Sequence, residues 1–254
     1  MKQVVVNSLL TTYEDEGTGK PAIIFLHGWG GGRYSLKPLW SKLSAHHRVL
    51  SLDFPGFGSS QTPPQDWTVS NFSSHVSIFL EKVGVEDDYV LIGHSFGGRV
   101  ILSGVGGGQL KPTKIVLIDA AGVADRPRSK VGYAAMAKAG KGLLSLPGLK
   151  GLQVAARRKL YKSIGNTDYL EAGSMKKVFT NTISEDLSAQ AEKVSTSTLL
   201  IWGENDTETP LSEGRKLASL ISGSELRVLP GLGHFPFDED ALAVLGLVER
   251  FLEE

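Results

Sequence analysis

Short apolar runs that alternate with helix-like segments are the feature of this sequence that most restricts its fold. Runs of this length, bounded by turn residues, are typical of strands that are buried on both faces of a parallel sheet. They lie at residues 22–26, 48–52, 89–92, 114–118, 198–202 and 226–229, with helical periodicity over residues 70–83, 211–221 and 239–252. The order strand, helix, strand predicts an α/β fold with a mostly parallel sheet and helices on both of its faces.

Two segments depart from this alternation. Residues 3–13 have the pattern of an antiparallel hairpin at one edge of the sheet. Residues 122–193 contain helix formers and Gly/Pro turns but no convincing strand, so we expect a small helical cap inserted after the sixth strand. The chain would then consist of a core, residues 1–121 and 194–254, and a cap over residues 122–193.

The predicted cap is basic. Residues 122–193 carry thirteen Lys and Arg against six Asp and Glu, whereas the whole chain has a formal net charge of zero. Such an excess is more typical of a solvated face than of a binding site. The functional alternative is attraction to anionic substrates or to an anionic membrane surface.

Composition limits the classes of function. The neutral chain has no overall field that would favour nucleic acid, and it has no cysteine, which excludes disulfides, thiolate catalysis and zinc–thiolate sites. The first residues show no signal-peptide pattern, and no apolar stretch approaches the roughly 18 residues of a spanning helix. We therefore expect a cytoplasmic protein without an integral membrane segment, and the sequence leaves its oligomeric state open.

A candidate nucleophile follows the run at residues 89–92. There the sequence reads Gly-His-Ser-Phe-Gly-Gly, which is a G-x-S-x-G pattern centred on Ser95. A sharp strand-to-helix turn would hold this serine in a strained backbone conformation, and Gly93 and Gly97 leave room for so tight a corner. The hydroxyl of Ser95 would then stand exposed beside the positive end of the following helix.

Two further side chains could activate this serine. A serine hydroxyl needs a base within hydrogen-bond reach, and the base needs a third group that fixes its tautomer. In an open parallel sheet such groups lie just beyond the carboxyl ends of the strands. Asp206 and His234 each follow a predicted strand, and so does Asp119, the alternative acid. The Gly-x-x-Asp setting favours Asp206, because it is similar to the common pattern of the family that the motifs below resemble.

The motifs and the chain order Ser, Asp, His resemble the α/β-hydrolase family, and the resemblance extends from residue 20 to the end of the chain. It implies a mostly parallel sheet of about eight strands with a cap over the nucleophile. The segment His27-Gly28-Trp29-Gly30-Gly31 is similar to the family's oxyanion loop. This similarity implies that the backbone N–H groups of Trp29 and Phe96 bind a developing oxyanion.

Aromatic residues near these motifs would line an apolar substrate pocket, as such sites usually require. The candidates are His27, Gly28, Phe57 and Phe235. The two phenylalanines can equally be core residues, and His27 is better explained as a structural brace of its loop than as a second base.

The family resemblance implies a serine hydrolase of the carboxylesterase type, which cleaves esters of short to medium chain through an acyl-enzyme. A triad of Ser95, His234 and Asp206 would act on a small-molecule ester without a cofactor or metal, and no His/Asp/Glu grouping has metal-ligand spacing. Two alternatives use the same triad: a C–C bond hydrolase of the meta-cleavage-product type, and a ligand-sensing receptor with slow turnover. Interception of the acyl-enzyme by peroxide would add a perhydrolase side activity.

Other motifs have simpler interpretations. His94 is expected to pack away from the serine's side of the turn, and His75 to be a surface or satisfied helix residue. The glycines of residues 104–108 lack the Lys-Ser/Thr of a phosphate loop and indicate a helix end. Residues 28–32 lack the glycine order of a dinucleotide fingerprint, so Asp53 is not assigned to a ribose.

Overall fold

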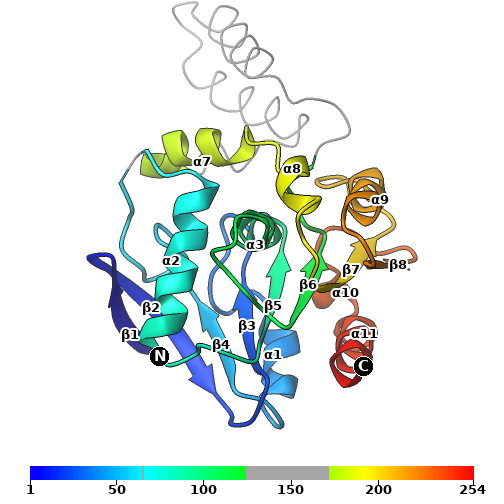
Figure 1. Cartoon of the computed structure of the whole chain (residues 1–254), viewed down its shortest axis with the longest axis horizontal. Coiled ribbons are helices and arrows are strands. Elements are labelled where there is room, and N and C mark those ends of the chain that lie inside the picture. The colour runs from blue at the N-terminus through cyan, green and yellow to red at the C-terminus, as the bar shows by residue number, and fades with distance from the viewer. Residues whose placement is uncertain (65, 124–171) are drawn as a thin grey trace, which may run out of the picture.

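The computed structural model describes residues 1–64, 66–123 and 172–254. Its strands are β1 (Lys2–Val6), β2 (Leu9–Glu16), β3 (Ala22–Leu26), β4 (Val49–Leu52), β5 (Tyr89–His94), β6 (Lys114–Ile118), β7 (Ser197–Gly203) and β8 (Glu225–Leu229). Within the described residues they form an eight-stranded sheet in the order β1-β2-β4-β3-β5-β6-β7-β8 (Figure 1). β1 pairs antiparallel with β2, β2 pairs antiparallel with β4, and the other neighbours are parallel. The predicted parallel sheet with a hairpin at one edge is confirmed.

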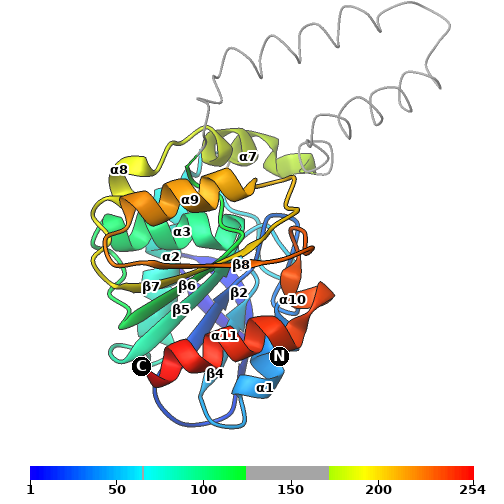
Figure 2. The ribbon, with the colours of Figure 1, turned by 90° about the vertical axis from the view of Figure 1, so that its right-hand side faces the viewer.

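Helices cover both faces of this sheet, as the alternation predicts. They are α1 (Lys37–Leu43), α2 (Val69–Lys82), α3 (Phe96–Gly106), η1 (Gly173–Met175), α7 (Lys176–Ile183), α8 (Ser188–Ala191), α9 (Leu211–Leu220), α10 (Pro236–Glu239) and α11 (Ala241–Glu253). α2, α3 and α9 lie on one face, and α1 and α11 lie on the other (Figures 1 and 2).

The core consists of two apolar layers, one on each face of the sheet. Val90 and Ile92 of β5 lie in the layer against α1 and α11, while Leu91 between them lies in the layer against α2 and α3, and all three are fully buried. A central strand buries both faces, so its sequence is continuously apolar. β8 does not follow this expectation, because it is an edge strand, and Val228 is 37% exposed.

Two sequence interpretations at helix ends can be compared with the structure. The helix predicted over residues 239–252 is α11, which begins two residues later than predicted, because Asp240 has a non-helical backbone and accepts a hydrogen bond from the Ala243 amide as the N-cap. The glycine run at residues 104–108 is the end of α3, which confirms the helix-end interpretation over a phosphate loop.

The predicted cap lies only partly within the described residues. η1, α7 and α8 follow β6 and precede β7 in the chain, and α8 packs against α3 and α9 (Figure 2). Residues 124–171, which hold the whole basic excess of the predicted cap, lie outside the described residues. Among the helices of the described part, none combines the length and the apolar character that crossing a bilayer requires.

Candidate active site

Ser95 occupies the sharp turn between β5 and α3. Its backbone has φ 49° and ψ −109°, a conformation that costs about 1–3 kcal/mol in a residue other than glycine. The two flanking glycines permit the turn, since a Cβ on Gly93 would lie 2.7 Å from the backbone of Gly97, and one on Gly97 would overlap the carbonyl oxygen of Leu26. The strained strand-to-helix turn expected from the sequence is present.

Asp206 and His234 form a buried hydrogen-bonded pair at the same edge of the sheet. Asp206 follows β7, and His234 lies between β8 and α10. The Nδ1–H of His234 donates to Asp206 Oδ2 at 2.7 Å. The imidazole can therefore act as a base through Nε2, because the carboxylate fixes the proton on the other nitrogen.

Further donors stabilise the charge of Asp206. Its Oδ1 accepts from the amides of Glu208 at 2.7 Å and Thr209 at 3.0 Å, and its Oδ2 lies 2.7 Å from the Thr209 hydroxyl. Burial alone would raise the pKa of Asp206, but the hydrogen bonds from His234 and Thr209 hold it below its usual range. This carboxyl is ionised at neutral pH, as a group that orients an imidazole must be.

His94 connects the turn that holds Ser95 to the loop between β8 and α10 that holds His234. Its Nε2–H donates to the carbonyl oxygen of His234 at 2.8 Å, and the two rings lie 4.7 Å apart. A Cβ on Gly28 would lie 2.8 Å from His94 Nδ1 and 3.4 Å from Ser95 Cβ, so the oxyanion loop passes close to both residues. Burial lowers the pKa of His94 to about 3, so this ring is a neutral support. His94 is a packing residue, as predicted, but its ring lies against His234 and not away from the candidate site.

The Nε2 edge of His234 faces a half-exposed carboxylate. Glu208 Oε2 lies 3.5 Å from Nε2, and the Glu208 side chain is 52% exposed. An ion pair of this length that is open to water contributes little.

The two amides expected to bind an oxyanion come from adjacent segments. Phe96 is the first residue of α3, and Trp29 lies in the loop after β3; their rings meet edge to face at 5.2 Å. Within the described residues neither amide donates a hydrogen bond. Both N–H groups can therefore be offered to a ligand.

The pocket candidates fall into two groups. Phe57 meets Trp29 at 4.8 Å, and Phe179 of α7 meets the same indole at 4.9 Å, which forms one aromatic cluster under the described part of the predicted cap. Phe235 is 45% exposed and lies against the imidazole of His234 at 5.1 Å. The first group contacts the loop of Trp29, and the second contacts His234.

His27 is a scaffold residue. It is 1% exposed, and its Nε2 accepts from the Phe54 amide at 3.0 Å, while Nδ1 lies 2.7 Å from the Gly28 carbonyl oxygen. Burial lowers the pKa of His27 to about 4. The brace interpretation is confirmed, and so little of the ring is exposed that a direct substrate contact is disfavoured.

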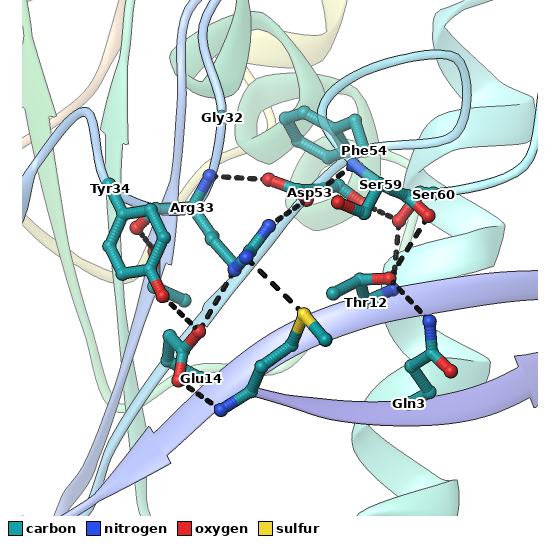
Figure 3. A network of polar contacts seen from close by, with 12 residues as sticks. Gln3, Thr12, Glu14, Gly32, Arg33, Tyr34, Asp53, Phe54, Ser59 and Ser60 are labelled. Carbon is teal, nitrogen blue, oxygen red and sulfur yellow. Dashed lines mark hydrogen bonds and ion pairs between the residues drawn. The ribbon is translucent and has the colours of Figure 1, made fainter.

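A charged network, which the sequence analysis did not find, fixes the oxyanion loop (Figure 3). Asp53, at the end of β4, accepts from the amide and the Nη1 of Arg33, each at 2.6 Å, and from the Ser59 amide at 2.9 Å. Arg33 also donates to Glu14 at 2.9 Å. Asp53 thus links the loop of Trp29 to the turn of Phe57. This structural role accounts for an aspartate at this position without a bound dinucleotide.

A second arginine that the sequence analysis missed anchors the predicted cap. Arg99 of α3 is buried, and its Nε donates to the carbonyl oxygen of Thr182 at the end of α7, at 2.8 Å. Its Nη2 also bonds the carbonyl oxygen of Glu185. The helix that begins at the serine turn therefore holds the segment that carries Phe179.

Asp119, the alternative acid, lies beside the Asp206–His234 pair without replacing Asp206. It is fully buried, and its Oδ1 accepts from the Gly203 amide at 2.9 Å. One ligand atom each of Asp119, Asp206 and His234 lie within 4.8 Å of one another. Sequence spacing gave no sign of this cluster, but it suits a metal poorly, because His234 Nδ1 and both Asp206 oxygens are already engaged with other protein groups.

The chain belongs to the α/β hydrolase family, whose model matches residues 23–247. A 2-hydroxy-6-oxo-2,4-heptadienoate hydrolase from Pseudomonas putida is 26% identical over 274 residues, which cover 99% of this chain and 95% of that relative. Two solved structures have the same fold. An enol-lactonase from Burkholderia xenovorans gives a TM-score of 0.79 at 21% identity, with both chains fully covered. A thermophilic esterase from Thermogutta terrifontis gives 0.75 at 21% identity, with 99% of this chain and 97% of the other covered.

Proposed function

We propose that this α/β hydrolase is a serine carboxylesterase that cleaves esters of short to medium chain. The observation that carries the proposal is the buried 2.7 Å hydrogen bond from His234 to Asp206, together with a serine in a strained turn directly after His94, whose ring lies 4.7 Å from that of His234. The family match and the fold shared with an esterase add support.

The reaction follows from the roles that these groups can take. The Ser95 oxygen attacks the ester carbonyl while His234 Nε2 accepts the hydroxyl proton, and the amides of Trp29 and Phe96 hold the oxyanion. His234 returns the proton to the departing alcohol. Water, deprotonated by the same nitrogen, then attacks the acyl-enzyme and releases the carboxylic acid and Ser95.

The proposal includes a cap over the nucleophile, formed by residues 122–193. Two contacts support a cap that bounds the pocket: the Phe179 ring packs on Trp29, and Arg99 donates a hydrogen bond to the carbonyl oxygen of Thr182 at the end of α7. Such a cap excludes water and limits the size of the substrate.

A series of p-nitrophenyl esters of increasing chain length tests the proposal. We expect hydrolysis that favours short and medium acyl chains and falls by at least about 10⁴-fold in Ser95→Ala, with an unchanged circular dichroism spectrum. Ser103→Ala, a substitution of a buried serine later in α3, is the matched control and should keep its activity. Retained hydrolysis in Ser95→Ala would contradict the proposal.

The second candidate is a C–C bond hydrolase, which the Pseudomonas putida relative favours. The same triad would then act on a vinylogous diketone. The two candidates are separated by measuring kcat/KM for a 2-hydroxy-6-oxo-dienoate and for p-nitrophenyl butyrate under the same conditions. A higher value for the dienoate would replace the ester proposal with the C–C one.

A further inference from the structure

Two buried carboxyl groups stand side by side with very different partners. Asp206 receives hydrogen bonds from the Glu208 and Thr209 amides and from the His234 imidazole. Asp119 is at least as deeply buried, yet within the described residues its Oδ2 has no hydrogen-bond donor, and only the Gly203 amide donates to its Oδ1.

This asymmetry decides which carboxyl carries the charge. A buried carboxylate oxygen without a donor is strongly unfavourable, and two adjacent carboxylates in a site without a cation cannot both stay ionised. Burial, followed by the nearby charges of Asp206 and Glu239, raises the pKa of Asp119 to about 9. A proton on Asp119 turns its unpartnered oxygen into a donor, and one carboxyl oxygen of Asp119 lies within 4.8 Å of one of Asp206. A hydrogen bond between the two side chains is among the causes that raise the pKa of Asp119 and lower that of Asp206.

We propose that Asp119 is a positioning residue whose protonated carboxyl donates a hydrogen bond to the Asp206 carboxylate and so holds it against His234. The inference rests on the proposed function, in which His234 is the base. This role is opposite to that of a triad acid. The protonated form of Asp119 donates the hydrogen bond to Asp206, whereas the ionised form would repel the Asp206 carboxylate and lower activity. The titratable groups that surround it are Asp206, His234 and Glu239.

The backbone at this position makes an informative substitution available. Asp119 has φ 43°, a left-handed conformation that asparagine tolerates better than most residues. In Asp119→Asn the amide oxygen can accept from Gly203 and the NH₂ can donate to Asp206, which reproduces the protonated acid. Asp119→Leu has a similar size but offers neither interaction.

The experiment compares Asp119→Asn, Asp119→Leu and Asp206→Asn with the wild type on one p-nitrophenyl ester, over a range of pH. At pH 7 we expect Asp119→Asn to stay within about threefold of wild-type kcat, while Asp119→Leu loses about 10- to 100-fold through the missing bond to a charged group. As pH rises through about 9, the wild type should lose activity while Asp119→Asn keeps it.

A second readout does not depend on catalysis. The infrared difference spectrum between the wild type and Asp119→Asn at pH 7 should contain the carbonyl band of a protonated carboxylic acid, and the band should disappear above pH 10. This measurement also keeps the proposal testable if Asp119→Leu does not fold.

Three results would overturn the proposal. One is a loss in Asp119→Asn as large as that in Asp206→Asn, which would make Asp119 an ionised acid. Another is equal activity in the asparagine and leucine variants, and the third is absence of the infrared band. Failure of the ester hydrolase proposal is recognised separately, because wild-type turnover would then be missing or would persist in Ser95→Ala.

Discussion

Two halves of the candidate site each contain a pair of buried carboxyl groups, and the two pairs differ in the groups that balance their charge. On one side, Asp53 after β4 and Glu14 of β2 share the guanidinium of Arg33, which lies in the loop after β3. There the permanent cation of Arg33 lies within ion-pair distance of both carboxyls. On the other side, after β6 and β7, Asp206 pairs with the imidazole of His234, and within the described residues neither Asp119 nor Asp206 has a salt bridge to an arginine or a lysine. Where such a cation is absent, one carboxyl has to keep a proton.

The difference separates a fixed half from a proton-handling half. Burial would raise the pKa of Glu14, but hydrogen bonds from the N-terminal amine, the Tyr34 hydroxyl and Arg33 lower it to about 2, so Glu14 stays ionised over the working range of pH. In the other half, burial raises the pKa of Asp119 to about 9. The fixed half presents the Trp29 amide, and the proton-handling half presents the base, which suits the division of labour in acyl transfer.

The largest effect should come from the acid of the proton-handling half. Asp206→Asn keeps the shape of the side chain but no longer enforces the reactive tautomer of His234, so we expect kcat to fall by about 10⁴-fold. Steady-state hydrolysis of a p-nitrophenyl ester measures the loss. A loss of less than about tenfold would mean that another group orients the imidazole.

The fixed half should respond through stability rather than through pH. Asp53→Asn leaves the buried guanidinium of Arg33 with less compensation and should lower the free energy of unfolding by about 3 kcal/mol. Urea denaturation at two pH values measures it, and the deficit should be the same at pH 6 and pH 8. Lys2→Ala, which breaks the exposed pair with Asp15, is the control and should cost about 0–1 kcal/mol.

The proton-handling half should make stability depend on pH. Unfolded Asp119 loses its proton near its ordinary pKa of 3.8, whereas the folded state keeps it to about 9, so the folded state binds more protons between these values. The contribution of Asp119 to unfolding free energy therefore falls as pH rises from about 4 to about 9 and is level above that range. Denaturation over this range should show the decline in the wild type and a flatter curve in Asp119→Asn. Parallel curves would contradict this expectation.

The smallest effect is expected at the rim of the proton-handling half. Glu208→Gln removes the half-exposed carboxylate 3.5 Å from His234 Nε2, and kcat/KM should change by no more than about threefold, less at high salt. A change beyond tenfold in this assay would show that Glu208 takes part in holding the base.

The sequence was sufficient to predict the sheet and to nominate three residues for the candidate site. Continuously apolar runs placed β3 and β6 at their observed residues, since strands buried on both faces admit little else. Ser95, Asp206 and His234 could be nominated because each lies in a segment that follows a strand, and the carboxyl ends of parallel strands converge.

What the sequence could not predict depends on contacts between distant residues. Arg99 lies 83 residues from its partner Thr182, and Arg33 lies 20 residues from Asp53, and no periodicity relates either pair. The proton on Asp119 was beyond prediction for a similar reason, because it depends on which donors surround two aspartates that lie far apart in the chain. The start of α11 at Ala241, two residues later than predicted, depends on Asp240 acting as its N-cap.

Covalent trapping tests the central claim most directly. After incubation with a p-nitrophenyl alkylphosphonate, in which the serine oxygen displaces p-nitrophenolate from phosphorus, peptide mapping by mass spectrometry locates the adduct. We predict a single stable phosphonyl group on Ser95, absent in Ser95→Ala and formed far more slowly in Asp206→Asn. An adduct on another residue, or one that forms equally fast without the Asp206 carboxylate, would contradict the account.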